Sequence, residues 1–336
     1  MDCRPEPVLA PNTRMCEALP MPTVLLFPGQ SSRYAGMLRK VCALYPDVAV
    51  PILRHASDVL GRDLAAEDDE PGPGTAVPND KVQTAMFLAN HIHWEILRSH
   101  GVEGDLSVGL SLGEYNHLVH IGALGFEDAL RLVAARGAAY ERGPTGAMAA
   151  VFPASEDEVR AAISRSPGTV EIANFNSPTQ HVIAGHRPAI DETARVLEDE
   201  HAASCVVIES RLPMHSSLFS PVAELFRPAL AAAAIRSPER PYVPNVLGRF
   251  SDDVTPARIR MLLADQVRSP VRFRHSIEML SERFPASAYI EVGPRTVIYD
   301  LLHRRWRPFR KYRTDADADV FAAALADTVK DIQRVA

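Results

Sequence analysis

Apolar positions in the first half of the chain form short continuous runs that alternate with longer amphipathic segments. The run Thr23–Phe27 stops at Pro28-Gly29, which predicts a buried strand entering a sharp turn. Residues 105–110 predict a second short strand. Helices are predicted at residues 81–100 and 126–142, because apolar residues recur there every three or four positions. This alternation of strands and helices indicates an α/β domain with a parallel sheet.

The middle of the chain has a different order of elements. The order β-α-β-β-α-β is typical of a small ferredoxin-like α+β unit. Its two central strands are expected to flank the turn Asn176-Ser177-Pro178. The predicted elements are strand 147–152, helix 155–164, strands 170–173 and 181–184, helix 189–201 and strand 204–208.

These patterns predict an α/β fold class, with one large α/β-hydrolase-like domain and a ferredoxin-like subdomain inserted in it. We expect the subdomain at residues 145–209 and the large catalytic domain at residues 22–144 and 210–336. The α/β pattern resumes after the insertion, with a strand predicted at residues 289–292. Residues 1–21 are polar and rich in proline, so we expect a flexible leader rather than a signal peptide.

Composition narrows the class of protein. The chain has 336 residues, 46% of them apolar, which is enough for a large core without disulfide or metal staples. The net charge of -6 argues against a nucleic-acid partner, because phosphate contacts need basic surface. No apolar run reaches the length of a membrane span. The four cysteines are scattered, which fits a reducing, cytoplasmic compartment and suggests no zinc site.

One motif indicates covalent chemistry. Gly109-Leu110-Ser111-Leu112-Gly113 matches G-x-S-x-G, in which a serine lies at a tight turn between a strand and a helix. The flanking glycines permit the turn, and the amide after the serine is placed to donate to an oxyanion. The five-residue pattern is weak by itself, but an apolar run precedes it and an amphipathic run follows it.

A nucleophilic serine needs a base, and the chain offers twelve histidines. Most of them are expected to be surface or satisfied core residues. His117 and His120 lie on the helix after the serine and are expected to point away from it. His215 follows the inserted subdomain directly, at a return point between two domains where clefts form. The turn after Phe27 would expose backbone amides at the same sheet edge.

Further motifs occur in a fixed order along the chain, from Thr23 to Leu302. They resemble those of the malonyl-CoA:acyl-carrier-protein acyltransferase family, which also supplies the acyltransferase domains of polyketide synthases. In order they are Phe27-Pro28-Gly29-Gln30, Gly109-Leu110-Ser111-Leu112-Gly113-Glu114, Arg136 on the next helix, Asn176-Ser177-Pro178-Thr179-Gln180, His215, Gln266 through Phe273, and Glu291-Val292-Gly293-Pro294.

The resemblance implies a ping-pong acyl transfer through a seryl ester. Ser111 would be the nucleophile and His215 its general base. The family orients this histidine through a main-chain carbonyl, here that of Gln266. Arg136 would pair with the free carboxylate of a malonyl group. The oxyanion hole would be formed by the amides of Gln30 and Leu112.

The resemblance also implies the partners. The substrate would be a thioester of coenzyme A or phosphopantetheine, contacted by Asn176, and the acceptor an acyl carrier protein. No bound cofactor, metal, nucleic acid or membrane is expected. The basic run at residues 303–313 would dock an acidic carrier through Arg304, Arg305 and Arg307, or would be a solvated tail.

Departures from the family pattern leave open which acyl group the chain transfers. Leu110 replaces the usual histidine, Ser31 and Arg33 replace glycine and glutamine, and Met214 is expected to lie at the acyl pocket. A stand-alone transferase of malonyl groups is the leading interpretation. Transfer of an unusual acyl or aminoacyl group between carriers, an editing hydrolase of acyl carriers, and a catalytically silent carrier-binding module stay open as alternatives.

Overall fold

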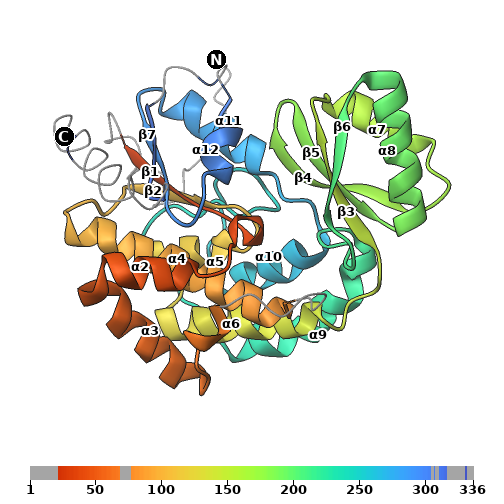
Figure 1. Ribbon diagram of the computed structural model, residues 1–336. Coiled ribbons are helices and arrows are strands. Elements are labelled where there is room, and N and C mark those ends of the chain that lie inside the picture. The colour runs from red at the N-terminus through yellow and green to blue at the C-terminus, as the bar shows by residue number, and fades with distance from the viewer. Residues whose placement is uncertain (1–21, 69–76, 304–305, 307–309, 316–329, 331–336) are drawn as a thin grey trace, which may run out of the picture.

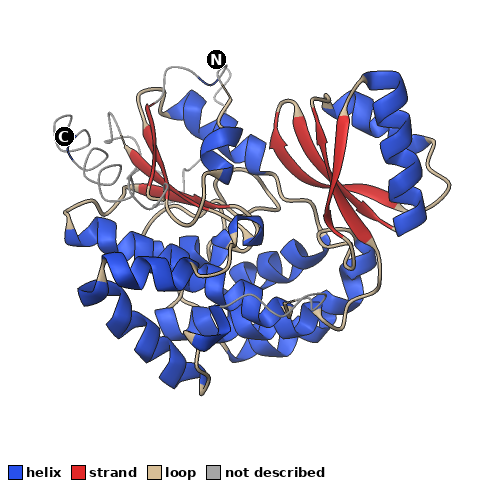
Figure 2. Cartoon of the chain, in the orientation of Figure 1, coloured by secondary structure: helices blue, strands red, loops and turns tan. Residues whose placement is uncertain are grey.

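The molecule has a large and a small unit (Figures 1 and 2). The computed structural model describes residues 22–68, 77–303, 306, 310–315 and 330. A parallel sheet with helices on both faces forms the large unit, and an antiparallel sheet with two helices on one face forms the small one. The predicted α/β fold class with an inserted α+β unit is confirmed.

Sheet A, the parallel sheet, has the strand order β2-β1-β7-β8. All three pairings in it are parallel, with Phe27 opposite Gly109 and Leu26 opposite Glu291. The carboxyl ends of β1 and β2, at Phe27 and Gly109, therefore lie side by side at one edge of the sheet. The last strand was not predicted, because its four residues lie within the basic run. The strands are β1 (Thr23–Phe27), β2 (Leu106–Gly109), β7 (Ala288–Glu291) and β8 (Arg310–Arg313).

The continuous apolar run of β1 has a physical cause, because helices cover both faces of sheet A. Leu25 and Phe27 face one core cluster, and Val24 and Leu26 face a second one on the opposite side. All four side chains are fully buried. Helices α11 and α12 pack on the side of Val24, and the other helices of the large unit pack on the side of Leu25.

The helices of the large unit include several that the sequence patterns did not assign. Pro46 starts one of these, and Pro221 and Pro256 lie in the first turns of two others, where proline costs no hydrogen bond. They are α2 (Met37–Leu44), α3 (Pro46–Leu60), α4 (Asn79–Ser99), α5 (Gly113–His120), α6 (Phe126–Tyr140), α9 (Ser220–Ala232), α10 (Pro256–Arg268), α11 (Phe273–Arg283) and α12 (Val297–Leu301).

Sheet B, the antiparallel sheet, has the order β4-β5-β3-β6, which is the ferredoxin-like arrangement predicted for this segment. A capping box between Ser155 and Glu158 starts its first helix. Its elements run from Ala147 to Glu209, and the domain division at residues 145–209 stays a prediction. They are β3 (Ala147–Phe152), α7 (Glu156–Ser164), β4 (Val170–Ser177), β5 (Gln180–Gly185), α8 (Arg187–His201) and β6 (Ser204–Glu209).

One expectation in this unit was wrong. Asn176 and Ser177 were predicted to lie in a turn, but they are the last residues of β4, and Ser177 pairs with Gln180. Register shifts along β4 let the strand continue past the turn-forming residues. As a result Asn176 is held by a strand at the boundary between the two units.

A segment of the large unit extends sheet B. The amide of Phe175 donates to the carbonyl of Val271 at 2.9 Å, and the amide of Val271 donates to Ala173 at 2.8 Å. The segment after α10 therefore covers the β4 edge of sheet B. Among the described residues no helix is both long and apolar enough to span a membrane.

Candidate active site

Ser111 lies in the turn between β2 and α5. Its φ of +51° is in the left-handed region, which is unusual for a residue with a Cβ atom. A Cβ atom at Gly109 would lie 2.0 Å from the carbonyl carbon of Gly113. A Cβ atom at Gly113 would lie 2.0 Å from the oxygen of Phe27. Both glycines are therefore required for a turn this tight, as the G-x-S-x-G motif predicted.

Asn245 holds this turn from the opposite side, and the sequence analysis missed it. Its Oδ1 accepts from the amide of Ser111 at 2.6 Å, and its Nδ2 donates to the oxygen of Gly109 at 2.7 Å. The side chain is buried. The available signal was one polar residue between the apolar pairs Val243-Pro244 and Val246-Leu247, a pattern too common to single out.

Ser111 and His215 form a direct hydrogen bond, with 2.7 Å between Oγ and Nε2. They are 104 residues apart in sequence and come from the two sides of the inserted unit. His215 also has a positive φ, +61°. Two non-glycine residues in this sparsely populated region mark a site where the surrounding structure fixes the backbone.

The main-chain oxygen of Gln266 lies 2.8 Å from Nδ1 of His215. Because a carbonyl oxygen only accepts, Nδ1 carries the proton and Nε2 is left free to accept from the serine hydroxyl. The side chain of Gln266 also stabilises the site. Its Nε2 donates to the main-chain oxygen of Ser111 at 2.8 Å and to Glu114 Oε2 at 2.7 Å.

Arg136 lies next to Ser111 and is fully buried. Its Nη2 is 3.3 Å from Ser111 Oγ and 3.3 Å from Gln266 Oε1, and its Nη1 donates to Gln83 Oε1 at 2.7 Å. The guanidinium carbon lies 4.4 Å from the ring centre of Tyr140. The amide oxygens of Gln83 and Gln266 and the ring of Tyr140 thus hold the planar guanidinium next to the serine oxygen.

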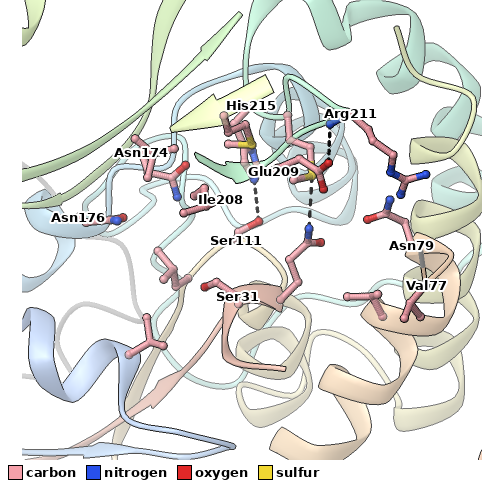
Figure 3. A pocket seen from close by; sticks show the side chains of 18 residues that line it. Ser31, Val77, Asn79, Ser111, Asn174, Asn176, Ile208, Glu209, Arg211 and His215 are labelled. Atoms are coloured by element: carbon pink, nitrogen blue, oxygen red, sulfur yellow. Dashed lines mark hydrogen bonds between the residues drawn. The ribbon is translucent and has the colours of Figure 1, made fainter. Parts of the chain in front are cut away.

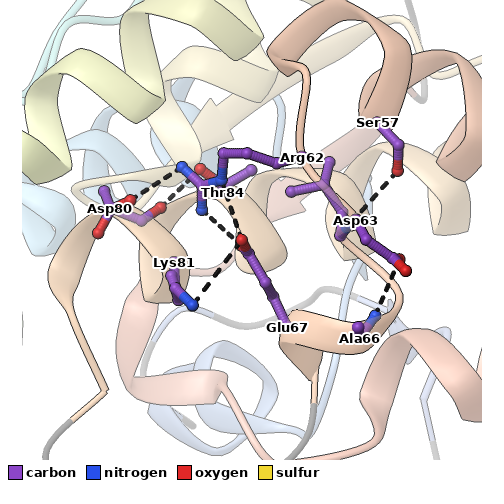
Figure 4. A network of polar contacts seen from close by, with 9 residues as sticks. Ser57, Arg62, Asp63, Ala66, Glu67, Asp80, Lys81 and Thr84 are labelled. Atoms are coloured by element: carbon purple, nitrogen blue, oxygen red, sulfur yellow. Dashed lines mark hydrogen bonds and ion pairs between the residues drawn. The ribbon is translucent and has the colours of Figure 1, made fainter.

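Helices α4 and α6 approach closely where Arg136 and Gln83 meet. A Cβ atom at Gly137 would lie 2.3 Å from the Cα atom of Asp80, so this contact requires glycine. Arg62 donates to Asp80 at 2.8 Å and also pairs with Glu67, which fixes the start of α4 (Figure 4). This polar network positions the first turn of α4 at the site.

Burial determines the protonation of the base. Desolvation lowers the pKa of His215 to about 3, with a further lowering by the positive charge of Arg136. The imidazole is therefore neutral at physiological pH, as a general base must be. Burial also raises the pKa of Glu114 to about 7, although Tyr242 and Gln266 donate to its carboxylate.

A cavity of about 220 Å³ opens in front of Ser111, between the two units (Figure 3). Four of the residues predicted from sequence line it with Ser111 and His215: Gln30, Leu110, Met214 and Asn176. Arg136 is not among its lining residues and reaches it only through Ser111. The other lining residues are Gly29, Ser31, Val77, Asn79, Val82, Met148, Asn174, Val182, Ile208, Glu209, Arg211 and Val297.

The two expected oxyanion donors belong to the turns that meet at the serine. Gln30 begins a short 3-10 helix after the turn that follows β1, and Leu112 follows the serine and is the N-cap residue of α5. A Cβ atom at Gly29 would lie 2.9 Å from the oxygen of Leu110 and 3.8 Å from Ser111 Cβ. The turn after β1 is thus packed against the serine, as required for its amide to reach a reacting carbonyl.

Other predicted residues lie elsewhere. His117 and His120 contact Ser107 through their Nδ1 atoms, at 2.6 and 2.8 Å, and point away from Ser111 as expected. Arg304, Arg305 and Arg307 lie outside the described residues. Within the described part of the chain, no three His, Cys, Asp or Glu side chains gather as metal ligands.

Fold and site together define a class: an α/β protein with a serine–histidine pair at a strand–helix turn and an inserted α+β unit. Residues 24–330 match the family described as the acyl transferase domain. The chain belongs to this acyltransferase family. It is an acyltransferase by this membership, and the predicted resemblance is confirmed.

Curated relatives agree with this assignment. The chain is 34% identical over 301 residues to the polyketide biosynthesis protein ThaF of Burkholderia thailandensis, covering 89% of this chain but only 25% of ThaF. It spans about a quarter of that relative. It is 32% identical over 286 residues to the malonyl CoA-acyl carrier protein transacylase of Salmonella typhimurium, covering 83% of this chain and 91% of that enzyme.

Solved structures share the whole fold. The protein MCAT of Streptococcus pneumoniae is 31% identical, with a TM-score of 0.81 over 92% of this chain and 99% of that one. A malonyl-transacylase solved with its type II polyketide synthase acyl-carrier protein is 27% identical, with a TM-score of 0.83 over 92% of this chain and 99% of that one.

Proposed function

We propose that the chain transfers a malonyl group from coenzyme A to the phosphopantetheine thiol of an acyl carrier protein, through an ester on Ser111. The hydrogen bond between Ser111 Oγ and His215 Nε2, with Nδ1 anchored on Gln266, carries the proposal. The curated relative of similar length is a malonyl CoA-acyl carrier protein transacylase, and one structural neighbour is a malonyl-transacylase solved with its acyl-carrier protein.

The first step forms the seryl ester. Ser111 Oγ attacks the thioester carbonyl carbon while Nε2 of His215 takes the hydroxyl proton. The tetrahedral intermediate collapses, the bond between carbon and sulfur breaks, and the leaving thiolate takes the proton back from Nε2. The low pKa of His215 keeps the base unprotonated before each attack.

The oxyanion of the intermediate needs donors that are in place before the reaction. We assign this role to the amides of Gln30 and Leu112, on the two turns that meet at Ser111. Such preorganised donors contribute several kcal/mol, about 2.7–4 for each one removed in a comparable site. Every catalytic group in the proposed reaction comes from the chain itself, so the proposal includes no resident cofactor.

Arg136 is assigned to the free carboxylate of the malonyl group. Its Nη2 lies 3.3 Å from the oxygen that would carry the ester, so a carboxylate two carbons along the acyl chain comes within reach of the guanidinium. Gln83 holds the other terminal nitrogen at 2.7 Å. A buried guanidinium with one terminal nitrogen next to the serine offers this carboxylate a charge-assisted hydrogen bond and a positive charge in a fixed position.

The pantetheine arm is assigned to the side of the cavity formed by sheet B. Asn174 and Asn176 line the cavity and are each 8% exposed. Neither Oδ1 atom has a hydrogen-bond partner within the described residues. Buried acceptors of this kind need donors, and the amide groups of the arm supply them. Leu110 and Met214 make the adjacent wall apolar.

The second step repeats the chemistry in reverse. His215 Nε2 takes the proton of the carrier thiol, the sulfur attacks the seryl ester, and Ser111 leaves with the proton returned by the imidazole. We place this reaction in the cytoplasm, where coenzyme A thioesters and carriers meet. Free thiols at Cys42 and Cys205 fit a reducing compartment.

The test measures transfer and hydrolysis together. The protein is incubated with malonyl-CoA and a holo carrier, and mass spectrometry follows malonyl-carrier while free malonate is quantified. Malonyl-carrier as the main product, absent with Ser111→Ala, supports the proposal. Malonate as the main product at every carrier concentration would identify a hydrolase instead. No product from the parent with malonyl-CoA would overturn the donor assignment.

A further inference from the structure

Glu114 is a buried carboxylate in the first turn of α5, and the proposed acyl transfer gives it no role. Three groups from outside its helix donate to it. The hydroxyl of Tyr242 donates to Oε1. The amide of Asn245 donates to Oε2 at 3.2 Å, and Nε2 of Gln266 donates to the same oxygen at 2.7 Å. A buried carboxylate is tolerated only with such donors, and these three connect α5 to two other segments of the large unit.

The two donors to Oε2 also hold the nucleophile. Asn245 Oδ1 accepts from the amide of Ser111 at 2.6 Å, and Gln266 Nε2 donates to the main-chain oxygen of Ser111 at 2.8 Å. These contacts close a ring. From the Ser111 amide the ring runs through Asn245 to Oε2 of Glu114, and it returns through Gln266 to the Ser111 oxygen. Oε2 is the acceptor that joins the two halves of the ring.

The ring encloses a backbone position that is unfavourable by itself. Ser111 has a φ of +51°, in the left-handed region that residues with a Cβ atom rarely adopt. Such a conformation persists only where the surrounding structure fixes it. Asn245 fixes the amide side of Ser111 and Gln266 fixes its carbonyl side. Because Oε2 of Glu114 holds both, its loss would free the two sides of the turn together.

The same carboxylate also bears on the base. The main-chain oxygen of Gln266 lies 2.8 Å from Nδ1 of His215 and orients the imidazole. The side chain of this glutamine is anchored on Glu114, so a displaced Gln266 would disturb nucleophile and base at once. Alignment of Ser111 Oγ with His215 Nε2, at 2.7 Å, thus depends on one buried acceptor.

We propose that Oε2 of Glu114 is a positioning acceptor, which holds Asn245 and Gln266 so that Ser111 keeps the geometry of attack. The inference rests on the proposed function, which makes Ser111 the nucleophile and His215 its base. Glu114 is buried and is not among the residues that line the cavity, so it acts through other residues and not on the substrate. Its loss slows the attack of Ser111 and leaves binding of the acyl donor unchanged.

Substitutions at Glu114 separate this role from burial alone. Glu114→Met removes both acceptor atoms and keeps the length of the side chain. Glu114→Gln keeps one acceptor, because its amide oxygen can replace Oε2 while its nitrogen donates to the Tyr242 oxygen. Asp68→Leu is the matched control. Asp68 is also buried, and one of its oxygens accepts from the amides of Leu38 at 2.9 Å and Arg39 at 3.0 Å, in α2.

The first measurement uses a small alkyl fluorophosphonate, which requires neither malonyl-CoA nor a carrier. Ser111 Oγ attacks phosphorus, His215 takes the hydroxyl proton and passes it to solvent, and fluoride leaves. The rate of adduct formation, followed by intact mass, therefore reports the geometry of the pair. Single-turnover acylation then gives the maximal rate and the half-saturating concentration of malonyl-CoA, and urea unfolding gives the stability of each variant.

Glu114→Met should lower the fluorophosphonate rate and the maximal acylation rate by at least about tenfold, because small misplacements of reacting groups have large effects on rate. The half-saturating concentration of malonyl-CoA should stay within about twofold of the parent. Glu114→Gln should keep both rates within about threefold. Asp68→Leu should lower the urea midpoint, as Glu114→Met does, while both of its rates stay within about twofold.

An unchanged rate in Glu114→Met overturns the proposal, and so do equal losses in Glu114→Met and Glu114→Gln. Equal rate losses in Glu114→Met and Asp68→Leu would mean that Glu114 acts through stability alone. Glu114→Asp keeps the charge but withdraws it by one methylene, and serves if the methionine variant does not fold. Its two rates should fall by at least about threefold, and parent-like rates would overturn the proposal.

The proposed function is judged on the parent alone. A parent that forms the fluorophosphonate adduct on Ser111 but is not acylated by malonyl-CoA would refute the assigned donor. The comparison of the Glu114 variants with the fluorophosphonate would still decide the positioning role. A parent that forms no adduct with either reagent would overturn both.

Discussion

The Nδ1 atom of His215 bonds to the main-chain oxygen of Gln266, at 2.8 Å, and not to a carboxylate. The orienting group is thus part of the last turn of α10 and carries no charge. A neutral acceptor leaves the imidazolium less stabilised than an aspartate would, and the buried, cationic surroundings lower the pKa of His215 further. The site therefore favours the neutral imidazole over the imidazolium.

The first prediction separates the backbone of Gln266 from its side chain. Gln266→Ala keeps the carbonyl that orients His215 and removes the contacts to Ser111, Glu114 and Arg136. Single-turnover acylation should fall by about tenfold in this variant. His215→Ala removes the base itself and should fall by about 10²–10⁴. Equal losses in the two variants would show that the Gln266 side chain is as essential as the base, and that orientation of His215 by the carbonyl alone is not sufficient.

The second prediction concerns acyl selectivity. Arg136→Ala should reduce acylation by malonyl-CoA by at least about 100-fold, because a carboxylate would enter a buried site without its cation. Acylation by acetyl-CoA should change far less, since the acetyl group has no charge to pair. Parallel rate measurements with the two donors check this. If both rates fell by the same factor, Arg136 would position Ser111 without recognising the substrate.

The third prediction tests the turn around the nucleophile. Gly113→Ala would place Cβ 2.0 Å from the oxygen of Phe27, and this oxygen cannot move aside because it belongs to the main chain of a paired strand. The free energy of unfolding should fall by about 3 kcal/mol or more, at the upper end for overpacked sites. Gly125→Ala is the control, since its Cβ would meet nothing closer than 3.9 Å. Urea unfolding of both variants decides, and similar midpoints would contradict the geometry of the turn.

The fourth prediction is a stability maximum at about pH 6–7. Histidine has a pKa of about 6.5 in the unfolded chain. A histidine whose pKa is lower than this in the folded protein stabilises the fold above pH 6.5, and this contribution is lost as the pH falls. Buried Glu114 and Glu291, whose pKa values are raised to about 7 and 8, act in the opposite sense, so their contribution is lost as the pH rises towards those values. Burial lowers the pKa to about 3 or 4 in His91, His93, His117, His120, His181 and His215.

The measurement is the free energy of unfolding by urea at several pH values between 4.5 and 8.5. The six histidines outnumber the two carboxyls, so the acid side of the maximum should be the steeper one. Each net proton taken up on unfolding contributes about 1.4 kcal/mol per pH unit. A stability that rises steadily from pH 6.5 to pH 5 would contradict the assignment of neutral buried histidines.

Much of the fold could be predicted because local patterns and tertiary roles coincide. β1 is apolar from Val24 to Phe27 because both faces of sheet A are covered. β3 was predicted with its observed bounds because its residues alternate between two cores. β4 was predicted too short, since Asn176 and Ser177 normally favour a turn. β8 was missed because its basic residues give no apolar pattern and only its pairing with β7 makes it a strand.

Part of the site could be predicted, where the proposed chemistry requires a particular residue type. Ser111, with its two glycines, and His215, at the return from the inserted unit, could be chosen from sequence, and the structure brings them together. Asn245 was not found, because a buried asparagine that holds a turn leaves no periodic or spacing signal.

The covalent intermediate on Ser111 is the central claim and can be measured directly. The protein is mixed briefly with malonyl-CoA, quenched in acid, digested and analysed by peptide mass spectrometry, beside Ser111→Ala. The account predicts one malonyl group on the peptide that contains Ser111, its loss when holo carrier is added before the quench, and no adduct in the variant. A malonyl group on another residue, or turnover by Ser111→Ala at the parent's rate, would contradict it.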